Sequence, residues 1–237
     1  MPWLRKASKG QRLRIPDEEL IPLGSEIIEL APDIVAAIML TLIAGWKRAS
    51  GFEDVNAQAC EVPMTERLRD GMRSELNSKG HPWGKMLVVL AGTESRSSGN
   101  VVIPDGRTDI PLMLIEVFLR TQEHDPHAII ECKRIAGASK RLCREYVVEG
   151  VDRFRTGKYG KNHARGFMAG YVLSGAVDGA ADGVNAYLTR VSRTAEHLTP
   201  ADICKGVLSW ESQHARAISL PAVRLYHAFL GLSDAVA

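Results

Sequence analysis

Charged residues interrupt two apolar stretches in the middle of the chain. Asp109 stands directly before the apolar run 110–115, and Glu131 and Lys133 follow the apolar residues 128–130. Charged side chains inside a core strand cost several kcal/mol unless they are paired or bind a metal. The two stretches therefore predict an ion cluster or a metal site at this point of the chain.

The two-residue period of a β-strand indicates how these charges lie. Residues two apart share a face, so Glu131 and Lys133 project together, while Cys132 between them points to the packed side. If the strands that begin at 110 and 127 are antiparallel neighbours, the start of the first lies beside the end of the second. We therefore expect Asp109 to lie next to Glu131.

This set of side chains is suited to hydrolysing a phosphodiester bond. Two neighbouring carboxylates repel each other unless a hard cation such as Mg²⁺ lies between them. An ammonium group beside them can orient or deprotonate a metal-bound water, and the metal can stabilise the charge that develops on a phosphoryl oxygen. Asp109, Glu131 and Lys133 supply these groups.

At these residues the chain resembles the PD-(D/E)xK nuclease superfamily, which has the restriction-endonuclease-like fold and carries an Asp on one strand and Glu-x-Lys on the next. The resemblance implies that Asp109, Glu131 and the backbone carbonyl of Cys132 bind Mg²⁺ or Mn²⁺, and that Lys133 activates the attacking water. It also matches Glu66 to the position from which the first core helix often contributes an acid. Glu66 could equally be a first-turn residue that complements the helix dipole.

The order of the expected elements supports the resemblance. It defines an α/β fold with a central mixed β-sheet flanked by helices and an added N-terminal helix. Thr65 and Ser139 are expected to cap two of the helices. The expected helices are 25–48, 61–77, 139–154 and one through Val184 and Val191; the expected strands are 86–91, 110–119, 127–135 and 167–173, with a hairpin loop at 95–100.

The length predicts a single α/β nuclease-like domain over 25–237, preceded by a basic N-terminal segment, 1–24, to which we assign no function. The core that resembles the nuclease superfamily covers about 61–188. Two further strand-like runs, 206–210 and 222–230, suggest a sheet extension over 203–232, and the second alternates apolar and polar residues as an edge strand does.

The expected N-terminal helix begins at a Ser25 cap and is broadly apolar around its circumference. Its apolar stretch, 34–46, is too short for a bilayer, which needs ~20 residues. We therefore expect no membrane span, and burial of this helix against the sheet or in a homodimer interface.

Positive charge is concentrated behind the Glu-x-Lys strand. The whole chain has a net charge of only +2, but 133–165 holds ten Lys or Arg against three acidic residues. This excess predicts contacts with a nucleic-acid backbone, with DNA favoured, although a solvated helix end would show similar charges. The expected nucleic-acid-binding residues are Lys140, Arg144, Arg155, Lys158, Lys161 and His163.

Several other functions have no sequence support. The four cysteines lack the paired spacing of a zinc site, and no Gly-rich phosphate loop ending in Gly-Lys-Ser/Thr indicates a nucleotide-driven motor. The N-terminus shows no apolar signal segment, so the cytoplasm is the expected location.

Together these features predict a metal-dependent nuclease, an effector of the kind that acts in restriction or phage defence. With no separate recognition domain in view, we expect targeting to come from a partner such as a helicase or other ATPase. Two alternatives remain open: a noncatalytic nucleic-acid-binding or assembly subunit with the same fold, and a buried structural ion triad in an unrelated α/β protein. The presence of all three core residues favours the enzyme.

Overall fold

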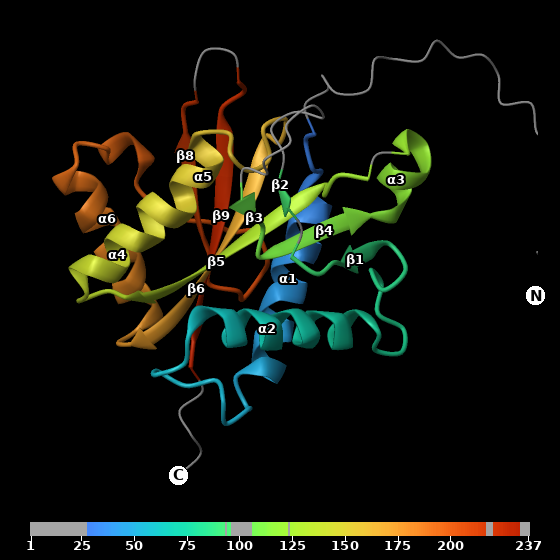
Figure 1. Ribbon diagram of the computed structural model, residues 1–237, viewed down its shortest axis with the longest axis horizontal. Coiled ribbons are helices and arrows are strands. Elements are labelled where there is room, and N and C mark those ends of the chain that lie inside the picture. Colours follow the sequence, from blue (N-terminus) through green and yellow to red (C-terminus); the bar gives the residue numbers. More distant parts are fainter. Residues whose placement is uncertain (1–27, 93, 96–105, 123, 217–219, 233–237) are drawn as a thin grey trace, which may run out of the picture.

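The protein forms a seven-stranded mixed sheet with helices on both faces (Figure 1). The computed structural model describes residues 28–92, 94–95, 106–122, 124–216 and 220–232. The strands, in their order across the sheet, are β1 (Leu87–Val89), β4 (Ile110–Leu114), β5 (Ala128–Ala136), β6 (Arg165–Ser174), β9 (Val223–Gly231), β8 (Trp210–His214) and β7 (Thr199–Pro200). A separate two-stranded ribbon pairs β2 (Glu94–Ser95) with β3 (Gly106–Arg107).

The three central strands are parallel and the outer pairs are antiparallel. β5 runs parallel to β6 and β6 parallel to β9, whereas β4 is antiparallel to β5 and β8 is antiparallel to β9. These central strands are buried on both faces, as parallel strands covered by helices usually are.

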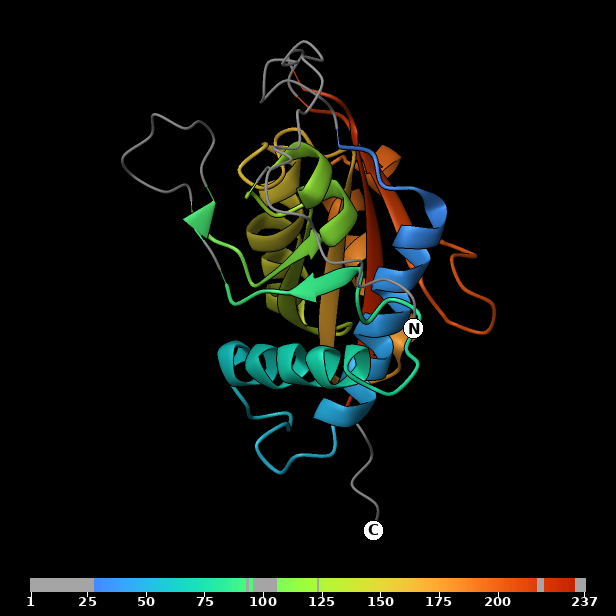
Figure 2. The same cartoon turned by 90° about the vertical axis from the view of Figure 1, so that its right-hand side faces the viewer.

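One helical layer consists of α1 (Pro32–Ala49) and α2 (Glu61–Leu76), which cross closely on one face of the sheet (Figure 2). The crossing depends on two glycines, because a Cβ on Gly71 would lie 2.2 Å from the carbonyl oxygen of Gly45. Trp46 of α1 stacks on Tyr171 of β6. The expectation that the N-terminal helix is buried against the sheet is therefore confirmed.

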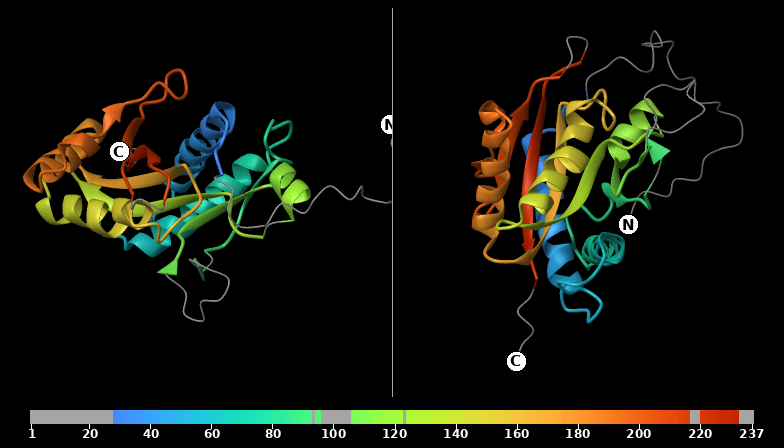
Figure 3. Two further views of the ribbon diagram at one scale, coloured as in Figure 1. Left: turned by 90° about the horizontal axis from the view of Figure 1, so that it is seen from above. Right: turned by 60° about the vertical axis from the view of Figure 1, so that its left-hand side comes forward.

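The opposite face is covered by a helical segment with three consecutive parts and by α6 (Val177–Arg190) (Figure 3). The segment comprises α4 (Lys140–Tyr146), the π-helix η1 (Val147–Val151) and α5 (Asp152–Arg155). Ser139 caps it as expected, because its hydroxyl accepts a hydrogen bond from the Leu142 amide. The strand expected over 167–173 and the helix through Val184 are also confirmed.

The strand expected over 110–119 is too long. β4 ends at Leu114, its last residue paired with β1, and α3 (Ile115–Thr121) follows. Apolar residues alone do not distinguish a strand from a short helix here. β1 begins at Leu87, opposite Leu114, so residues beyond Leu114 have no partner in β1.

One expected helix start and one expected cap are wrong. The N-terminal helix begins at Pro32, whose fixed φ suits a first turn, and Ile28 instead forms a β-bridge with His163. Ser25 lies outside the described residues. Thr65 is not a cap, because α2 begins at Glu61 and the Thr65 hydroxyl donates to the Glu61 carbonyl inside the helix.

The edge-strand expectation for 222–230 is also wrong. β9 lies between β6 and β8 in the interior of the sheet, and its polar residues find partners there. Residues 203–232 do extend the sheet, through β8 and β9, but the first of the two expected runs is misplaced, because of residues 206–210 only Trp210 belongs to a strand. The loop expected at 95–100 is outside the described residues except for Ser95, which belongs to β2. None of the described helices is long and apolar enough to cross a membrane.

Candidate functional site

Antiparallel pairing of β4 with β5 sets the geometry of the predicted site. Ile110 lies opposite Ile130, so the next pair outward brings Asp109 beside Glu131. Asp109 accepts a hydrogen bond on Oδ2 from the Cys132 amide at 2.8 Å. The two strands therefore bring together the three residues that the sequence singled out.

Lys133 is held by three oxygen atoms. Its Nζ lies 2.9 Å from Glu131 Oε1 and donates to Glu61 Oε1 at 2.7 Å and to the Cys132 carbonyl at 2.8 Å. An ammonium group has three donors, so all of them are engaged. The Cys132 carbonyl, expected as a metal ligand, accepts from Lys133 in this arrangement.

Glu61, rather than Glu66, is the acid that α2 brings to Lys133. Glu61 is the first residue of α2, and its second carboxylate oxygen accepts from the Arg134 amide at 3.2 Å. Glu66 is 53% exposed and pairs with Arg69 at 2.7 Å. It approaches the site only indirectly, through Arg69, which donates to the Asp109 carbonyl.

A second cation, Arg153, completes the cluster and was not among the predicted catalytic residues. Its Nη1 lies 2.7 Å from Glu131 Oε1 and donates to the Tyr159 hydroxyl at 2.6 Å. Tyr159 in turn donates to the Arg107 carbonyl. We call Asp109, Glu131, Lys133, Glu61 and Arg153 the ion cluster.

Glu131 is in an electrostatically costly position. Its side chain is fully buried, and Oε2 has no hydrogen-bond partner among the described residues. Burial, followed by the nearby Asp109 carboxylate, raises the pKa of Glu131 to about 8, even though Lys133 and Arg153 act in the opposite direction.

Lys133 remains charged at neutral pH. Burial by itself lowers the pKa of Lys133, but the carboxylates of Glu131, Glu61 and Asp109 together raise that pKa above its ordinary value. An ammonium that keeps its protons is a hydrogen-bond donor rather than a base. Of the two roles that the sequence allows for Lys133, orientation of a water or an anion fits this environment better than proton removal.

The cluster offers a partial set of ligands for a hard cation. Asp109 and the unpartnered Oε2 of Glu131 are two oxygen donors of the kind that Mg²⁺ prefers. Within the described ranges no three His, Cys, Asp or Glu side chains are grouped so as to hold a metal ion. Mg²⁺ commonly uses only one or two carboxylates, together with waters and substrate phosphate, so the residues present fit such an ion.

The predicted nucleic-acid-binding residues differ in how they are placed. Lys140 and Arg144 are exposed on α4, and Lys158 and Lys161 are exposed in the loop after α5. That loop, 156–164, is attached to the ion cluster through Tyr159.

The other two residues of that set are less suited to binding phosphate. Arg155 lies 3.5 Å from Glu196, which already neutralises part of its charge. His163 is buried, and burial, followed by Arg216, lowers its pKa to about 4. At neutral pH His163 is therefore an uncharged, internal ring.

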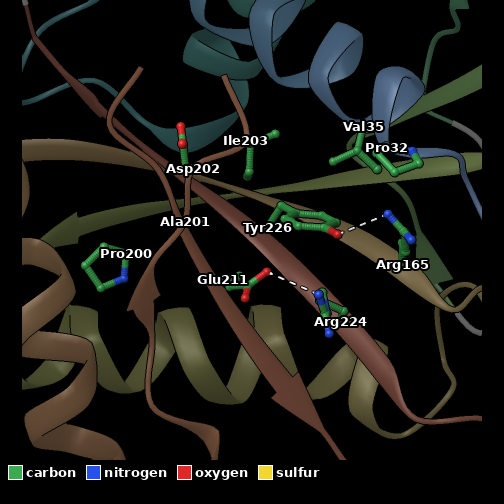
Figure 4. Close-up of a pocket in the computed structure, with 10 residues that line it drawn as sticks. All are labelled: Pro32, Val35, Arg165, Pro200, Ala201, Asp202, Ile203, Glu211, Arg224 and Tyr226. Atoms are coloured by element: carbon green, nitrogen blue, oxygen red, sulfur yellow. Dashed lines mark hydrogen bonds and ion pairs between the residues drawn. The ribbon is translucent and has the colours of Figure 1, made fainter. Parts of the chain in front are cut away.

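A separate pocket of about 410 Å³ lies at the N-terminal end of α1, over β8 and β9 (Figure 4). Three of its charged groups have partners: Arg165 donates to the Tyr226 hydroxyl at 3.2 Å, and Arg224 lies 3.5 Å from Glu211. None of the ion-cluster residues lines it.

Comparison of the chain with protein-family models, with curated proteins and with solved structures finds no match. The functional interpretation therefore depends on the site and the fold alone.

Proposed function

We propose that this protein is a metal-dependent nuclease with a restriction-endonuclease-like core, which hydrolyses phosphodiester bonds of nucleic acid, with DNA favoured. The observation that carries the proposal is the fully buried Glu131, whose Oε2 lacks a partner among the described residues although two cations hold Oε1. A buried carboxylate oxygen without a partner costs free energy, and binding a cation there would recover it.

The order of elements is consistent with this proposal. A helix (α2), two antiparallel strands that carry the acids (β4 and β5), a helical segment and a parallel strand (β6) follow one another as the nuclease resemblance implies. The exposed lysines of the 156–164 loop lie on a segment attached to the cluster by Tyr159, where a nucleic-acid backbone would pass.

In the proposed reaction a water oxygen attacks phosphorus and releases a proton to solvent, one P–O ester bond breaks, and the leaving oxygen takes up a proton. Asp109 and Glu131 would hold Mg²⁺ or Mn²⁺, which supplies charge stabilisation at the phosphoryl oxygen and a more acidic bound water. Lys133, kept as an ammonium by its neighbouring carboxylates, would orient the attacking water or a phosphate oxygen by exchanging one of its three protein contacts for it. Glu61 holds the Lys133 ammonium in place.

A second candidate is the noncatalytic subunit. The observation that favours it is the saturation of Lys133, all of whose donors already have protein partners. An ion cluster whose ammonium donors are all paired within the protein can be purely structural. In either function, a helicase or another ATP-driven partner, or a second copy of the chain, could supply targeting.

The test is cleavage by the purified protein of supercoiled plasmid, linear duplex and single-stranded DNA and RNA, with Mg²⁺, Mn²⁺ or EDTA. We expect metal-dependent cleavage that Asp109→Asn removes while circular dichroism and the thermal melt stay close to wild type. Glu66→Gln is the matched control, because that carboxylate pairs with Arg69 outside the cluster.

Absence of divalent-ion binding by calorimetry, both with and without nucleic acid, together with absence of cleavage, would favour the noncatalytic subunit. If Asp109→Asn instead destabilises the protein and its folded fraction cleaves at the wild-type rate, the cluster is structural.

A further inference from the structure

Of the two cations in the ion cluster, Arg153 is the one that reaches toward solvent, since the side chain of Lys133 is only 8% exposed. The Arg153 side chain is 29% exposed, while that of its partner Glu131 is 0% exposed. Two contacts fix one end of the guanidinium, Glu131 at 2.7 Å and the Tyr159 hydroxyl at 2.6 Å, and both involve Nη1. The Tyr159 ring also lies under the guanidinium, 5.2 Å from its centroid.

The opposite edge of the same guanidinium is open. Nε and Nη2 of Arg153 have no partner among the described residues. Arginine carries five N–H donors in a fixed plane, and Nη1 provides only two of them. The remaining donors form the fork geometry that matches two oxygens of a phosphate.

A local irregularity of the helix directs Arg153 to this position. The π-helix η1 (Val147–Val151) ends two residues before Arg153. A π-turn inserts one residue into the α-helical repeat, which rotates the next helical residues by about 100° relative to a regular helix. Phe154 then faces the core, where it is fully buried, and Arg153 faces Glu131.

The π-helix also lies directly against the strand that carries the acids. A Cβ on Gly150 would lie 3.2 Å from Lys133 Cγ and 2.6 Å from the Met168 methyl carbon. The absence of a side chain at Gly150 therefore brings the backbone of the π-helix close to the Lys133 side chain of β5. π-turns of this kind occur frequently at functional sites.

We propose that Arg153 binds the phosphate of the nucleic-acid substrate through its Nε–Nη2 edge while its Nη1 stays anchored on Glu131 and Tyr159. This inference rests on the proposed nuclease function and adds to it a substrate-contacting residue that the sequence motif does not contain. An anchored guanidinium loses little conformational freedom when the phosphate binds. Its charge also lies where negative charge increases during phosphoryl transfer.

Lysine cannot perform both tasks. The ammonium of an Arg153→Lys variant can still neutralise Glu131, but it has no second edge with which to hold a phosphate in a fixed orientation. Arg153→Lys therefore separates the substrate contact from the ion pair, and Arg153→Gln removes both. Arg48→Lys and Arg48→Gln are matched controls, since Arg48 forms a comparable 2.8 Å pair with Glu75 on the α1–α2 surface.

The experiment measures three quantities for the full chain and each variant. These are Mn²⁺ affinity by calorimetry without nucleic acid, duplex-DNA affinity in EDTA as a function of salt, and the cleavage rate at saturating DNA with Mg²⁺. We expect Arg153→Lys to keep Mn²⁺ affinity and melting temperature while cleavage falls about 100-fold. Arg153→Gln should make the slope of log affinity against log salt shallower by about one.

The outcomes separate the two proposals. The inference fails if wild type cleaves and Arg153→Lys cleaves equally well. It also fails if Arg153→Lys and Arg153→Gln lose Mn²⁺ affinity, melting temperature and activity in proportion. In both cases Arg153 only supports Glu131. If wild type cleaves nothing with any metal, the nuclease proposal fails. The salt slope then decides on Arg153 alone: a slope unchanged in Arg153→Gln overturns the phosphate contact, and a shallower slope supports it.

Discussion

Two groups of polar side chains are buried around the same helical segment, and they differ in how completely their hydrogen bonds are satisfied. The ion cluster concentrates charge and leaves Glu131 Oε2 without a partner among the described residues. The second group, which we call the hydrogen-bonded chain, runs from Tyr146 through His227, Ser212 and His214 to Glu196. Its first three links are 2.9, 2.7 and 2.7 Å, followed by a contact between His214 Nδ1 and Glu196.

One proton per link is sufficient to satisfy the whole hydrogen-bonded chain. Tyr146 donates to His227 Nδ1, His227 Nε2–H donates to Ser212, the Ser212 hydroxyl donates to His214 Nε2, and His214 Nδ1–H donates to Glu196. Burial lowers the pKa of His227 well below its ordinary value, in agreement with a neutral ring.

Ser212, His214 and Glu196 have the connectivity of a hydrolase triad. However, Ser212 is 4% exposed and a second histidine occupies its remaining side, so no substrate could reach its oxygen. The difference between the two groups indicates their roles. A satisfied network specifies packing, whereas an unsatisfied charged one is a candidate for binding and chemistry.

The largest effect that distinguishes the two groups is on cleavage. We expect Glu131→Gln to reduce the cleavage rate by about 10³-fold or more, because it removes a proposed metal ligand and its charge. Ser212→Ala should leave the rate of the folded protein within about threefold of wild type. Single-turnover cleavage of plasmid DNA measures both. If Ser212→Ala were the variant that abolished cleavage, the roles assigned to the two groups would have to be exchanged.

The next effect is on the free energy of unfolding as pH rises from about 5 to 8. The pKa of Glu131 is raised from 4.5 to about 8 by burial and then by Asp109, so the folded state binds its proton more tightly than the unfolded state does. The stabilisation is complete below about pH 4.5 and is lost as pH rises through about 8. The difference corresponds to about 5 kcal/mol.

In EDTA, therefore, the wild-type free energy of unfolding should fall between about pH 5 and 8, and Glu131→Gln should remove most of that fall. Denaturant titrations at several pH values measure it. Glu145→Gln is the control, since Glu145 pairs with Arg141 at the surface, where a pair contributes about 1 kcal/mol or less. Equal pH profiles for wild type and Glu131→Gln would mean that burial beside Asp109 does not raise the pKa of Glu131.

How much of the candidate site could be predicted from the sequence depends on whether the residues that contact one another lie on neighbouring strands of the sheet. Asp109, Glu131 and Lys133 could be placed together from the sequence because a two-residue period and one antiparallel pairing determine their positions. The α/β class could be predicted because apolar runs of strand character, such as 128–130 and 167–173, alternate along the chain with expected helices.

The contacts that join Glu61, Arg153 and Tyr159 to the ion cluster could not be predicted, because these residues belong to elements whose placement depends on tertiary packing. An N-cap at Thr65 would leave Glu61 outside the helix, whereas Glu61 is the first residue of α2. The π-turn that directs Arg153 has no sequence signal beyond a glycine at 150. In β9, His227 resembles a solvent-facing edge residue until its partner Tyr146, 81 positions away, is known.

A smaller effect concerns the stability of the hydrogen-bonded chain itself. Ser212→Ala leaves two buried imidazole nitrogens, on His214 and His227, without their shared partner. We expect a loss of about 2 to 4 kcal/mol in the free energy of unfolding. Ser209→Ala is the matched control, because this buried serine donates a single bond to the Ala201 carbonyl and should cost about 1 kcal/mol. Equal losses for the two variants would show that the chain is not a connected network.

The smallest effect tests which of the two groups lies near the nucleic acid. Lys158 and Lys161 flank Tyr159, which contacts the ion cluster. The double variant Lys158→Ala, Lys161→Ala should therefore make the slope of log affinity against log salt shallower by about two.

The control double variant, Arg190→Ala with Lys205→Ala, removes the same charge near the hydrogen-bonded chain. Arg190 and Lys205 lie on the segments that flank Glu196 and lead to β8. Because phosphate contacts are local whereas net charge acts on the whole molecule, the second double variant should change the slope little. Binding titrations in EDTA between low and moderate salt measure both slopes. Two equal decreases would mean that net charge alone governs binding, and the 156–164 loop would then have no specific role.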